Sequence, residues 1–224
     1  MKPCQPKIAA GLESTDDFAG ILASALAGEE DIANLLFQNV LSPGADAHKM
    51  EFSGVEFHRC RLNGSLFDKA SFVDVRFCDC DLTECSFSDA YFSRCEFISC
   101  KWVGGNLTGA TLRQSRAERC SFQYANFDGA SIGGTALNEC DFTGAVLANA
   151  ALQDLLQRDN RWIGTNFFHT PLKGMDFSKD TVDGWMLSEG LGELKGAVFS
   201  PYQAVDLALL LGIRIKTNES SALI

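Results

Sequence analysis

A repeat of five residues constrains this chain more than any other feature of its sequence. From Phe52 to Leu187 every fifth residue is a repeat centre, and 26 of these 28 centres are large and apolar. The exceptions are Ala117 and Gln157, and thirteen of the 17 Phe residues lie on this one phase. A period of five fits neither the 3.6-residue helix nor the two-residue strand. The chain must therefore turn a corner once every five residues.

From Cys60 to Ala150 the residue two positions before each centre is small, most often Ala or Cys. We expect the centres and these small residues to point inward, because the three remaining positions are mostly polar. Burying each Phe or Leu centre contributes about 1.5–3 kcal/mol. The predicted core includes Phe57, Phe77, Phe97, Phe127, Phe142, Trp162, Cys80, Cys100, Cys120 and Cys140.

This pattern resembles the pentapeptide-repeat family, whose repeat is a small residue, Asp or Asn, Leu or Phe, and two variable residues. The resemblance spans residues 50 to 190. It implies an all-β fold, a right-handed quadrilateral β-helix with four pentapeptides in each coil. We expect an N-terminal helical cap in residues 1–48, the β-solenoid in residues 49–198, and a C-terminal helix, short strand and tail in residues 199–224.

Seven of the nine cysteines occupy the small inward position, where a free thiol packs as a compact hydrophobe. Five of them recur every 20 residues and should form a ladder inside one side of the solenoid: Cys60, Cys80, Cys100, Cys120 and Cys140. Disulfides are the first alternative, although parallel inward side chains are poorly aimed for them. A metal site is the second, but the chain has three His and no C-x-x-C pair. The sequence predicts buried thiols, with no metal and no cofactor.

Two helices are predicted ahead of the repeats. Residues 14–17 are spaced as a capping box before apolar residues at helical spacing in 18–26. An acidic turn and the apolar stripe of residues 32–40 predict a second helix, which Pro43 and Gly44 end. These helices are interpreted as a lid on the first coil, since solenoids need polar caps. Docking of a partner is the alternative.

A further helix is predicted over residues 202–211, after Ser200 and Pro201, with a short strand at 213–215. Its surface is apolar around most of the circumference, more than the single stripe needed to cover a coil. The excess predicts a homodimer, with a monomeric cap as the alternative. The predicted interface consists of Tyr202, Val205, Leu207, Leu210 and Leu211.

Two segments are similar to stretches of the Qnr-type quinolone-resistance proteins, a group within the same family. They are residues 160–164 and the pair 202–204 and 211–213. The resemblance implies a protein that mimics DNA, binds DNA gyrase and topoisomerase IV, and dimerises through its C-terminal helix. Unlike the Qnr proteins of Gram-negative bacteria, this chain has no loop between its repeats, and its N-terminal segment is longer.

The charge of the chain bears on this hypothesis. The net charge of −10 argues against a direct nucleic-acid ligand, because such binding neutralises phosphates. Residues 50–190 carry 19 acidic and 13 basic side chains. A duplex as long as seven coils, about 34 Å, carries roughly 20 phosphate charges, far more than this net of −6. A type II topoisomerase and an unknown protein partner of a generic scaffold therefore both remain hypotheses.

The sequence predicts no catalytic residue. It contains no phosphate-binding, dinucleotide-binding or H-E-x-x-H motif, and a packed solenoid offers no cleft. No run of apolar residues reaches eighteen, and the start of the chain leads into no apolar run typical of a signal peptide. We therefore expect a cytoplasmic protein that does not enter a membrane.

Overall fold

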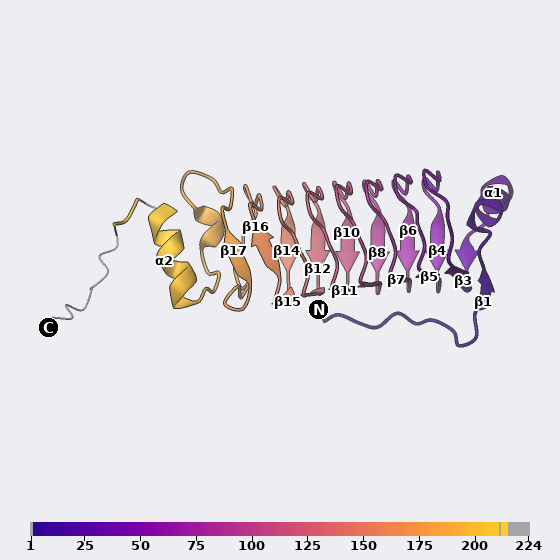
Figure 1. Ribbon diagram of the computed structural model, residues 1–224, viewed down its shortest axis with the longest axis horizontal. Coiled ribbons are helices and arrows are strands. Elements are labelled where there is room, and N and C mark those ends of the chain that lie inside the picture. Colours follow the sequence, from indigo (N-terminus) through magenta and orange to yellow (C-terminus); the bar gives the residue numbers. More distant parts are fainter. Residues whose placement is uncertain (1, 211, 215–224) are drawn as a thin grey trace, which may run out of the picture.

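The computed structural model, which describes residues 2–210 and 212–214, shows a rod of stacked coils with a helix at each end (Figure 1). Equivalent residues of neighbouring coils are 20 positions apart. Phe52 pairs with Phe72 and Phe57 pairs with Phe77, both in parallel strands. Each coil therefore contains four five-residue repeats, which confirms the predicted four-sided β-solenoid.

Two sides of the rod are parallel β-sheets. Side A is an eight-stranded sheet in the order β1-β3-β5-β7-β9-β11-β13-β15, and side B is a seven-stranded sheet in the order β14-β12-β10-β8-β6-β4-β2. Single bridges join the coils on the other two sides. Arg61 with Asp81 is one such pair on side C, and Leu66 with Ser86 is one on side D.

The strands of side A are β1 (Glu13–Thr15), β3 (Leu35–Gln38), β5 (Glu56–His58), β7 (Arg76–Cys78), β9 (Glu96–Ile98), β11 (Arg116–Glu118), β13 (Ala136–Asn138) and β15 (Leu156–Arg158). Those of side B are β2 (Ile32–Ala33), β4 (Glu51–Ser53), β6 (Ser71–Val73), β8 (Tyr91–Ser93), β10 (Thr111–Arg113), β12 (Ser131–Gly133) and β14 (Ala151–Gln153). β16 (Arg161–Ile163) and β17 (Thr181–Asp183) pair separately. The helices are α1 (Phe18–Gly28), the 3₁₀-helix η1 (Gly192–Leu194) and α2 (Pro201–Leu210).

Most corners of the coils are turned by a residue in the left-handed region, two positions after the centre. Asp79 and Arg94 have φ of 54° and 53°, a conformation that costs an L-residue about 1–2 kcal/mol. Hydrogen bonds between coils offset this cost. The corner residue Arg59, for example, donates its N–H to the carbonyl of Cys78 in the next coil over 2.9 Å.

Stacked aromatic rings fill the interior. The Phe57 and Phe77 rings lie 4.7 Å apart at 4°, and the Phe52 and Phe72 rings lie 4.9 Å apart at 3°. Each of the ten predicted core residues is at most 2% exposed. Ala117 interrupts the stack between Phe97 and Leu137, and an apolar interior cavity of about 20 Å³ lies there. Such a space holds about one water molecule.

The second predicted N-terminal helix is wrong. Residues 32–38 form strands β2 and β3, in which Ile32 pairs with Phe52 and Phe37 pairs with Phe57. Ile32 and Phe37 are buried centres five residues apart, so a further coil precedes the predicted start of the solenoid. The apolar spacing of this segment also fits a helix, which explains the error.

The first helix forms as predicted, but its cap differs. Ser14 lies in β1, and the helix instead begins after Asp17, whose Oδ1 accepts a hydrogen bond from the Gly20 N–H over 2.8 Å. The capping-box prediction is therefore wrong. The buried side chains of α1 are Phe18, Leu22 and Ala25, which cover the end of the rod.

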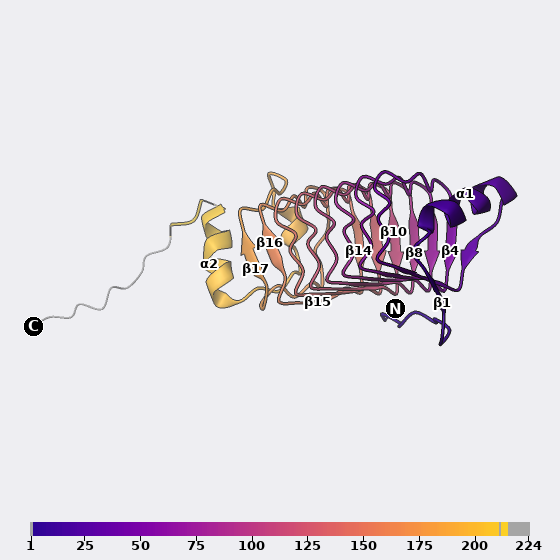
Figure 2. The same ribbon diagram turned by 45° about the vertical axis from the view of Figure 1, so that its right-hand side comes forward.

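Residues 2–12, which we call the N-terminal arm, fall within the predicted helical cap, but they are not helical. The arm turns back from β1 and runs along the outside of the rod toward its middle (Figures 1 and 2). Its Pro6 is buried. Because the arm carries no apolar period, the five-residue repeat gives no information about its position.

The C-terminal helix α2 begins at Pro201 and is capped reciprocally. The Ser200 N–H donates to Gln203 Oε1 over 2.7 Å, and the Gln203 N–H donates to Ser200 Oγ over 3.4 Å. The strand predicted at 213–215 is absent at its two described residues, Ile213 and Arg214, while residue 215 lies outside the described part. No helix in the described ranges is long and apolar enough to cross a membrane.

Candidate interaction surfaces

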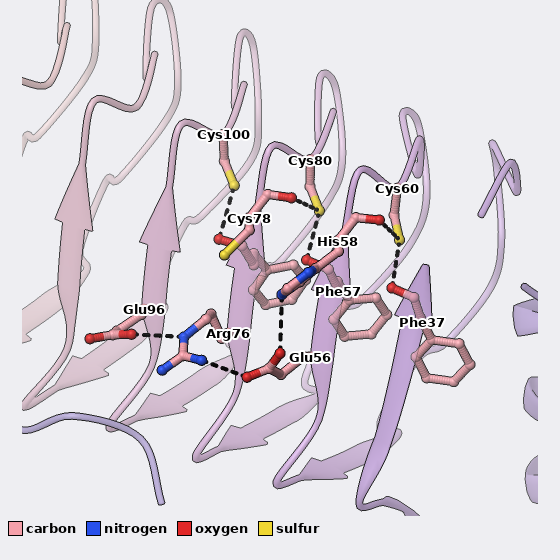
Figure 3. A network of polar contacts seen from close by, with 11 residues as sticks. Phe37, Glu56, Phe57, His58, Cys60, Arg76, Cys78, Cys80, Glu96 and Cys100 are labelled. Carbon is pink, nitrogen blue, oxygen red and sulfur yellow. Dashed lines mark hydrogen bonds and ion pairs between the residues drawn. The ribbon is translucent and has the colours of Figure 1, made fainter. Parts of the chain in front are cut away.

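The cysteine ladder lies inside the corner between sides A and C (Figure 3). The thiols of Cys60, Cys80, Cys100 and Cys120 each donate to a carbonyl oxygen of the preceding coil, whereas the Cys140 thiol donates to the Asn138 oxygen of its own coil. Cys60 Sγ lies 3.4 Å from the Phe37 oxygen, and Cys80 Sγ lies 3.3 Å from the Phe57 oxygen. All nine cysteines of the chain are free. The ladder is thus a set of packed thiols and offers no surface to a ligand.

Burial disfavours the reactive form of three inward thiols. It raises the pKa of Cys85 to about 12 and that of Cys95 to about 12, and it raises the pKa of Cys100 as well. The thiolate is the reactive form of cysteine, so these groups stay protonated at neutral pH. Cys78, which is half-buried on side A, has its pKa raised to about 11 by the same cause.

The ladder ends in buried polar residues, Asn160 and Asp180, that continue its 20-residue spacing. Asn160 Nδ2 donates to the Leu137 carbonyl over 2.9 Å, the contact that a cysteine makes in earlier coils. The Asp180 carboxylate accepts from the Asn160 N–H over 2.9 Å and from Trp162 Nε1 over 3.0 Å. Gln203 Nε2 of α2 donates to the carbonyls of Asp180 and Phe177 over 2.8 and 2.9 Å.

The buried polar network shows the structural role of three residues that carry the Qnr resemblance. Asn160 and Trp162 belong to the first segment and Gln203 to the second, and the network joins both to the last coil. Burial raises the pKa of Asp180, although its two N–H donors oppose that effect. Asn160, Trp162 and Gln203 therefore have a structural role, which is to hold α2 against the last coil.

Side A carries a ladder of alternating charges on its outer surface (Figure 3). Arg76 lies between Glu56 and Glu96, with N–O distances of 2.5 and 2.9 Å. On the neighbouring edge, Arg94 pairs with Asp74 through two hydrogen bonds of 2.6 and 2.7 Å. The bond to Arg94 is the main cause of a lowered pKa for Asp74. These pairs neutralise the charges of Arg76 and Arg94.

Side D differs because its middle has acidic charge without basic charge. The middle of side D with its two edges consists of residues 84–89, 104–109, 124–129, 144–149 and 164–169. These residues include Glu84, Asp89 and Asp128 but no Lys or Arg. Hydrogen bonds join the outer side chains of successive coils. Asn126 Nδ2 donates to Thr108 Oγ1 over 3.0 Å, for example. Side D is thus a regular, polar and weakly acidic surface.

The exposed aromatic residues noted from the sequence are scattered. Tyr91 lies on side B, Tyr124 on the edge between sides C and D, and Phe168 on side D, where it stacks on His169 with ring centroids 3.9 Å apart. Isolated surface aromatics are common in soluble proteins. They do not form one patch that marks a binding site.

Helix α2 exposes one apolar face. Tyr202, Val205 and Leu209 are spaced for one side of a helix and are 86%, 43% and 55% exposed. Leu207 lies on the opposite side, half-buried beside a cavity of about 50 Å³ that Val182 and Trp185 also line. Leu207 thus faces the last coil. Leu209 was not part of the predicted interface. Of that interface, Leu211 and the side chain of Leu210 lie outside the described part of the structure.

Within the described residues, no three His, Cys, Asp or Glu side chains gather in a way that could hold a metal ion. His58 lies on side A beside Glu56, with Nε2 and Oε2 3.0 Å apart, and His169 lies on the edge of side D. The histidines therefore form no shared site with a nucleophile. The surfaces that remain as candidates for binding are the four sides, the arm and the exposed face of α2.

Two family models match the chain. A model described as "Pentapeptide repeat region" matches residues 70–141, and one described as "Pentapeptide repeats (9 copies)" matches residues 47–90. Together they cover the coils in which the five-residue spacing is most regular. None of the curated proteins matches the chain.

Several solved structures are similar to this one. Trypsin-treated QnrB1, a plasmid-mediated fluoroquinolone resistance protein, is 20% identical with a TM-score of 0.41, over 81% of this chain and 90% of that one. HetL, involved in heterocyst differentiation regulation in the cyanobacterium Nostoc sp. strain PCC 7120, is 16% identical with a TM-score of 0.39, over 83% and 98%. At these values the likenesses carry no argument about a partner.

Proposed function

We propose that this chain, which is a pentapeptide-repeat protein, is a non-catalytic rod that binds another protein through its outer sides. The filled interior carries this proposal. The aromatic stack leaves a cavity of about 20 Å³ inside the coils, too small for a substrate. Contacts with another molecule must therefore be made by the outer surface, which is long and regular.

Side D is the surface that we assign to the partner. Its middle carries acidic groups without basic ones, whereas Arg76 of side A and Arg94 on the edge of side B are paired with carboxylates. A basic protein surface would therefore be attracted to side D and less to the other sides. The net charge of −6 in residues 50–190 acts in the same direction.

The specific partner that we propose is a type II topoisomerase, which binds DNA through basic surfaces. The support is the sequence resemblance to the Qnr-type proteins and the acidic side D. The charge density is low for a DNA mimic, since duplex DNA carries about one charge every 1.7 Å. A generic scaffold with a different protein partner is therefore the alternative.

The test is a gyrase supercoiling assay with the purified protein, with and without a fluoroquinolone. The topoisomerase hypothesis predicts inhibited supercoiling and altered drug sensitivity. Glu84→Lys with Asp89→Lys on side D should weaken the effect, whereas Glu139→Lys with Glu189→Lys, an equal charge change elsewhere, should not. If gyrase and topoisomerase IV are unaffected at micromolar protein, the generic scaffold replaces the topoisomerase hypothesis.

We also propose a homodimer through α2. The exposed face of Tyr202, Val205 and Leu209 is apolar, and a second copy can cover it about a two-fold axis. The face lies at the end of the rod, so the dimer would be a longer rod with α1 at both outer ends (Figure 1).

A further inference from the structure

The N-terminal arm lies along the edge between sides A and B and is held by few contacts. In the described part of the chain, the Cys4 N–H donates to the Gln114 carbonyl over 2.9 Å, and the Lys7 N–H donates to Asp74 Oδ1 over 2.9 Å. Gln114 Nε2 also lies 3.5 Å from Cys4 Sγ. Most arm side chains are exposed, and Pro6 is the buried one.

The spacing of the arm matches the spacing of the coils. Asp74 and Gln114 are 40 residues apart, which is two coils and therefore about 9.6 Å along the rod. Cys4 and Lys7 are three residues apart, and three residues of polyproline II helix span about 9.3 Å. The N–H groups of two residues that are three positions apart in an extended segment can therefore reach acceptors that are two coils apart.

The sequence of the arm favours this conformation. Pro3 and Pro6 are spaced as P-x-x-P, and each precedes a residue whose N–H contacts the rod. Proline fixes φ near the polyproline II value, and three residues make one turn, so both prolines lie on one face of the segment. Domains that recognise proline-rich segments use this same preformed geometry.

Three outward residues of the rod near the arm are buried when the arm is in place. Ser93, Glu96 and Ala136 occupy outward positions, yet they are 6%, 6% and 7% exposed. Ala136 stands where the preceding coils of side A carry Glu96 and Arg116. Together with the two acceptors Asp74 and Gln114, these three residues define what we call the edge trough.

The arm does not fill the trough. An open cavity of about 270 Å³ lies between Pro3, Cys4 and Gln5 of the arm and Glu96, Arg116, Ala136 and Asn138 of the rod. A segment with bulkier side chains at these positions would bury more surface than the arm does. The net acidic charge of the solenoid favours a basic segment, and the arm itself carries Lys2 and Lys7.

We propose that the edge trough is a docking site for a basic proline-rich segment of a partner protein, with P-x-x-P spacing, and that the arm occupies it in the absence of the partner. This inference rests on the proposed binding role but uses a different surface from side D. If the peptide does not bind while gyrase is inhibited, the docking proposal fails and the proposed function stands.

The experiment measures binding of a fluorescent synthetic peptide with the sequence of residues 2–12, under reducing conditions. The receptor is the full chain with Pro3→Gly and Pro6→Gly, which loosen the arm without changing the coils. In the unmodified protein the tethered arm competes with the peptide at an effective concentration of about 1 mM. For a peptide that binds with a dissociation constant of about 0.1 mM, loosening the arm should therefore tighten the apparent binding about tenfold.

Two further variants test the location. Adding Ala136→Arg should fill the trough and abolish the gain, whereas adding Ser121→Arg at the equivalent position on side C should preserve it. A peptide with its prolines moved out of the three-residue spacing should not bind. The proposal is overturned if the loosened variant binds the peptide no better than the unmodified protein, if Ala136→Arg leaves binding intact, or if the altered peptide binds equally well.

Discussion

The helices at the two ends of the rod contact the coils through different chemistry. At the first end, the Phe18 ring of α1 packs edge-on against Phe37 with centroids 5.1 Å apart, and Leu22 and Ala25 are buried beside it. At the other end, Gln203 of α2 bonds two carbonyls while Tyr202 remains 86% exposed. An apolar cap closes one end, whereas a polar anchor leaves the other end able to associate.

Removing the apolar cap should have the largest effect. Phe18→Ala deletes a fully buried ring that also contacts Phe57, with centroids 5.9 Å apart, and should lower the free energy of unfolding by about 3–5 kcal/mol. Tyr202→Ala at the other end should change it by less than about 0.5 kcal/mol. Urea unfolding followed by circular dichroism measures both. Equal losses in the two variants would contradict the comparison.

Removing the polar anchor should have an intermediate and local effect. Gln203→Ala leaves the buried carbonyls of Phe177 and Asp180 without this donor, at a cost of about 1–3 kcal/mol. Hydrogen exchange should speed up in residues 201–210 while the central coils stay protected, because each coil contacts mainly its neighbours. Asp206→Ala in the same helix is the control. Faster exchange throughout the solenoid would show that the anchor is not local.

Charging the exposed face of α2 should change assembly with little change in folding. Val205→Glu with Leu209→Glu should convert a dimer into a monomer, and the free energy of unfolding of the coils should change by about 0.5 kcal/mol or less. Light scattering at micromolar concentration measures the mass. Leu26→Glu on α1, which is 48% exposed, should leave the dimer intact. If the unmodified protein is monomeric, α2 is a cap like α1.

The smallest expected effect is a pH dependence at the C-terminal end. Burial raises the pKa of Asp180 above the value of about 3.9 for an unfolded chain. The protonated form is therefore favoured in the folded state, and its stabilising contribution is lost as the pH rises through the raised pKa. Asp180→Asn should remove this part of the pH dependence. Thermal melts between pH 4 and pH 7 test it, and identical slopes for both proteins would contradict the assignment.

Most of the solenoid could be predicted because each centre is a separate observation of the same geometry. The first coil could not, because Ile32 and Phe37 are followed by Ser42, a polar residue where the next centre should lie. The arm could not be placed either, because its position depends on contacts with Asp74 and Gln114, far away in the sequence. The P-x-x-P spacing of the arm is the sequence feature that indicates an extended conformation.

The candidate surfaces were predictable only in part. The apolar residues of α2 could be identified, but the orientation of the helix follows from Gln203 bonding the last coil, which turns Leu207 toward Trp185. The charge of side D is visible in the sequence once the coils are assigned. The pairing of Arg76 with both of its neighbours required the register between coils.

The 20-residue register also determines how the rod responds to a pulling force. Because hydrogen bonds join each coil to the next, tension applied between the two ends of the chain peels coils from an end one at a time. Each event releases 20 residues, or about 70 Å of contour length. The extension trace should thus be a staircase of nearly equal steps, with α2 detaching before α1.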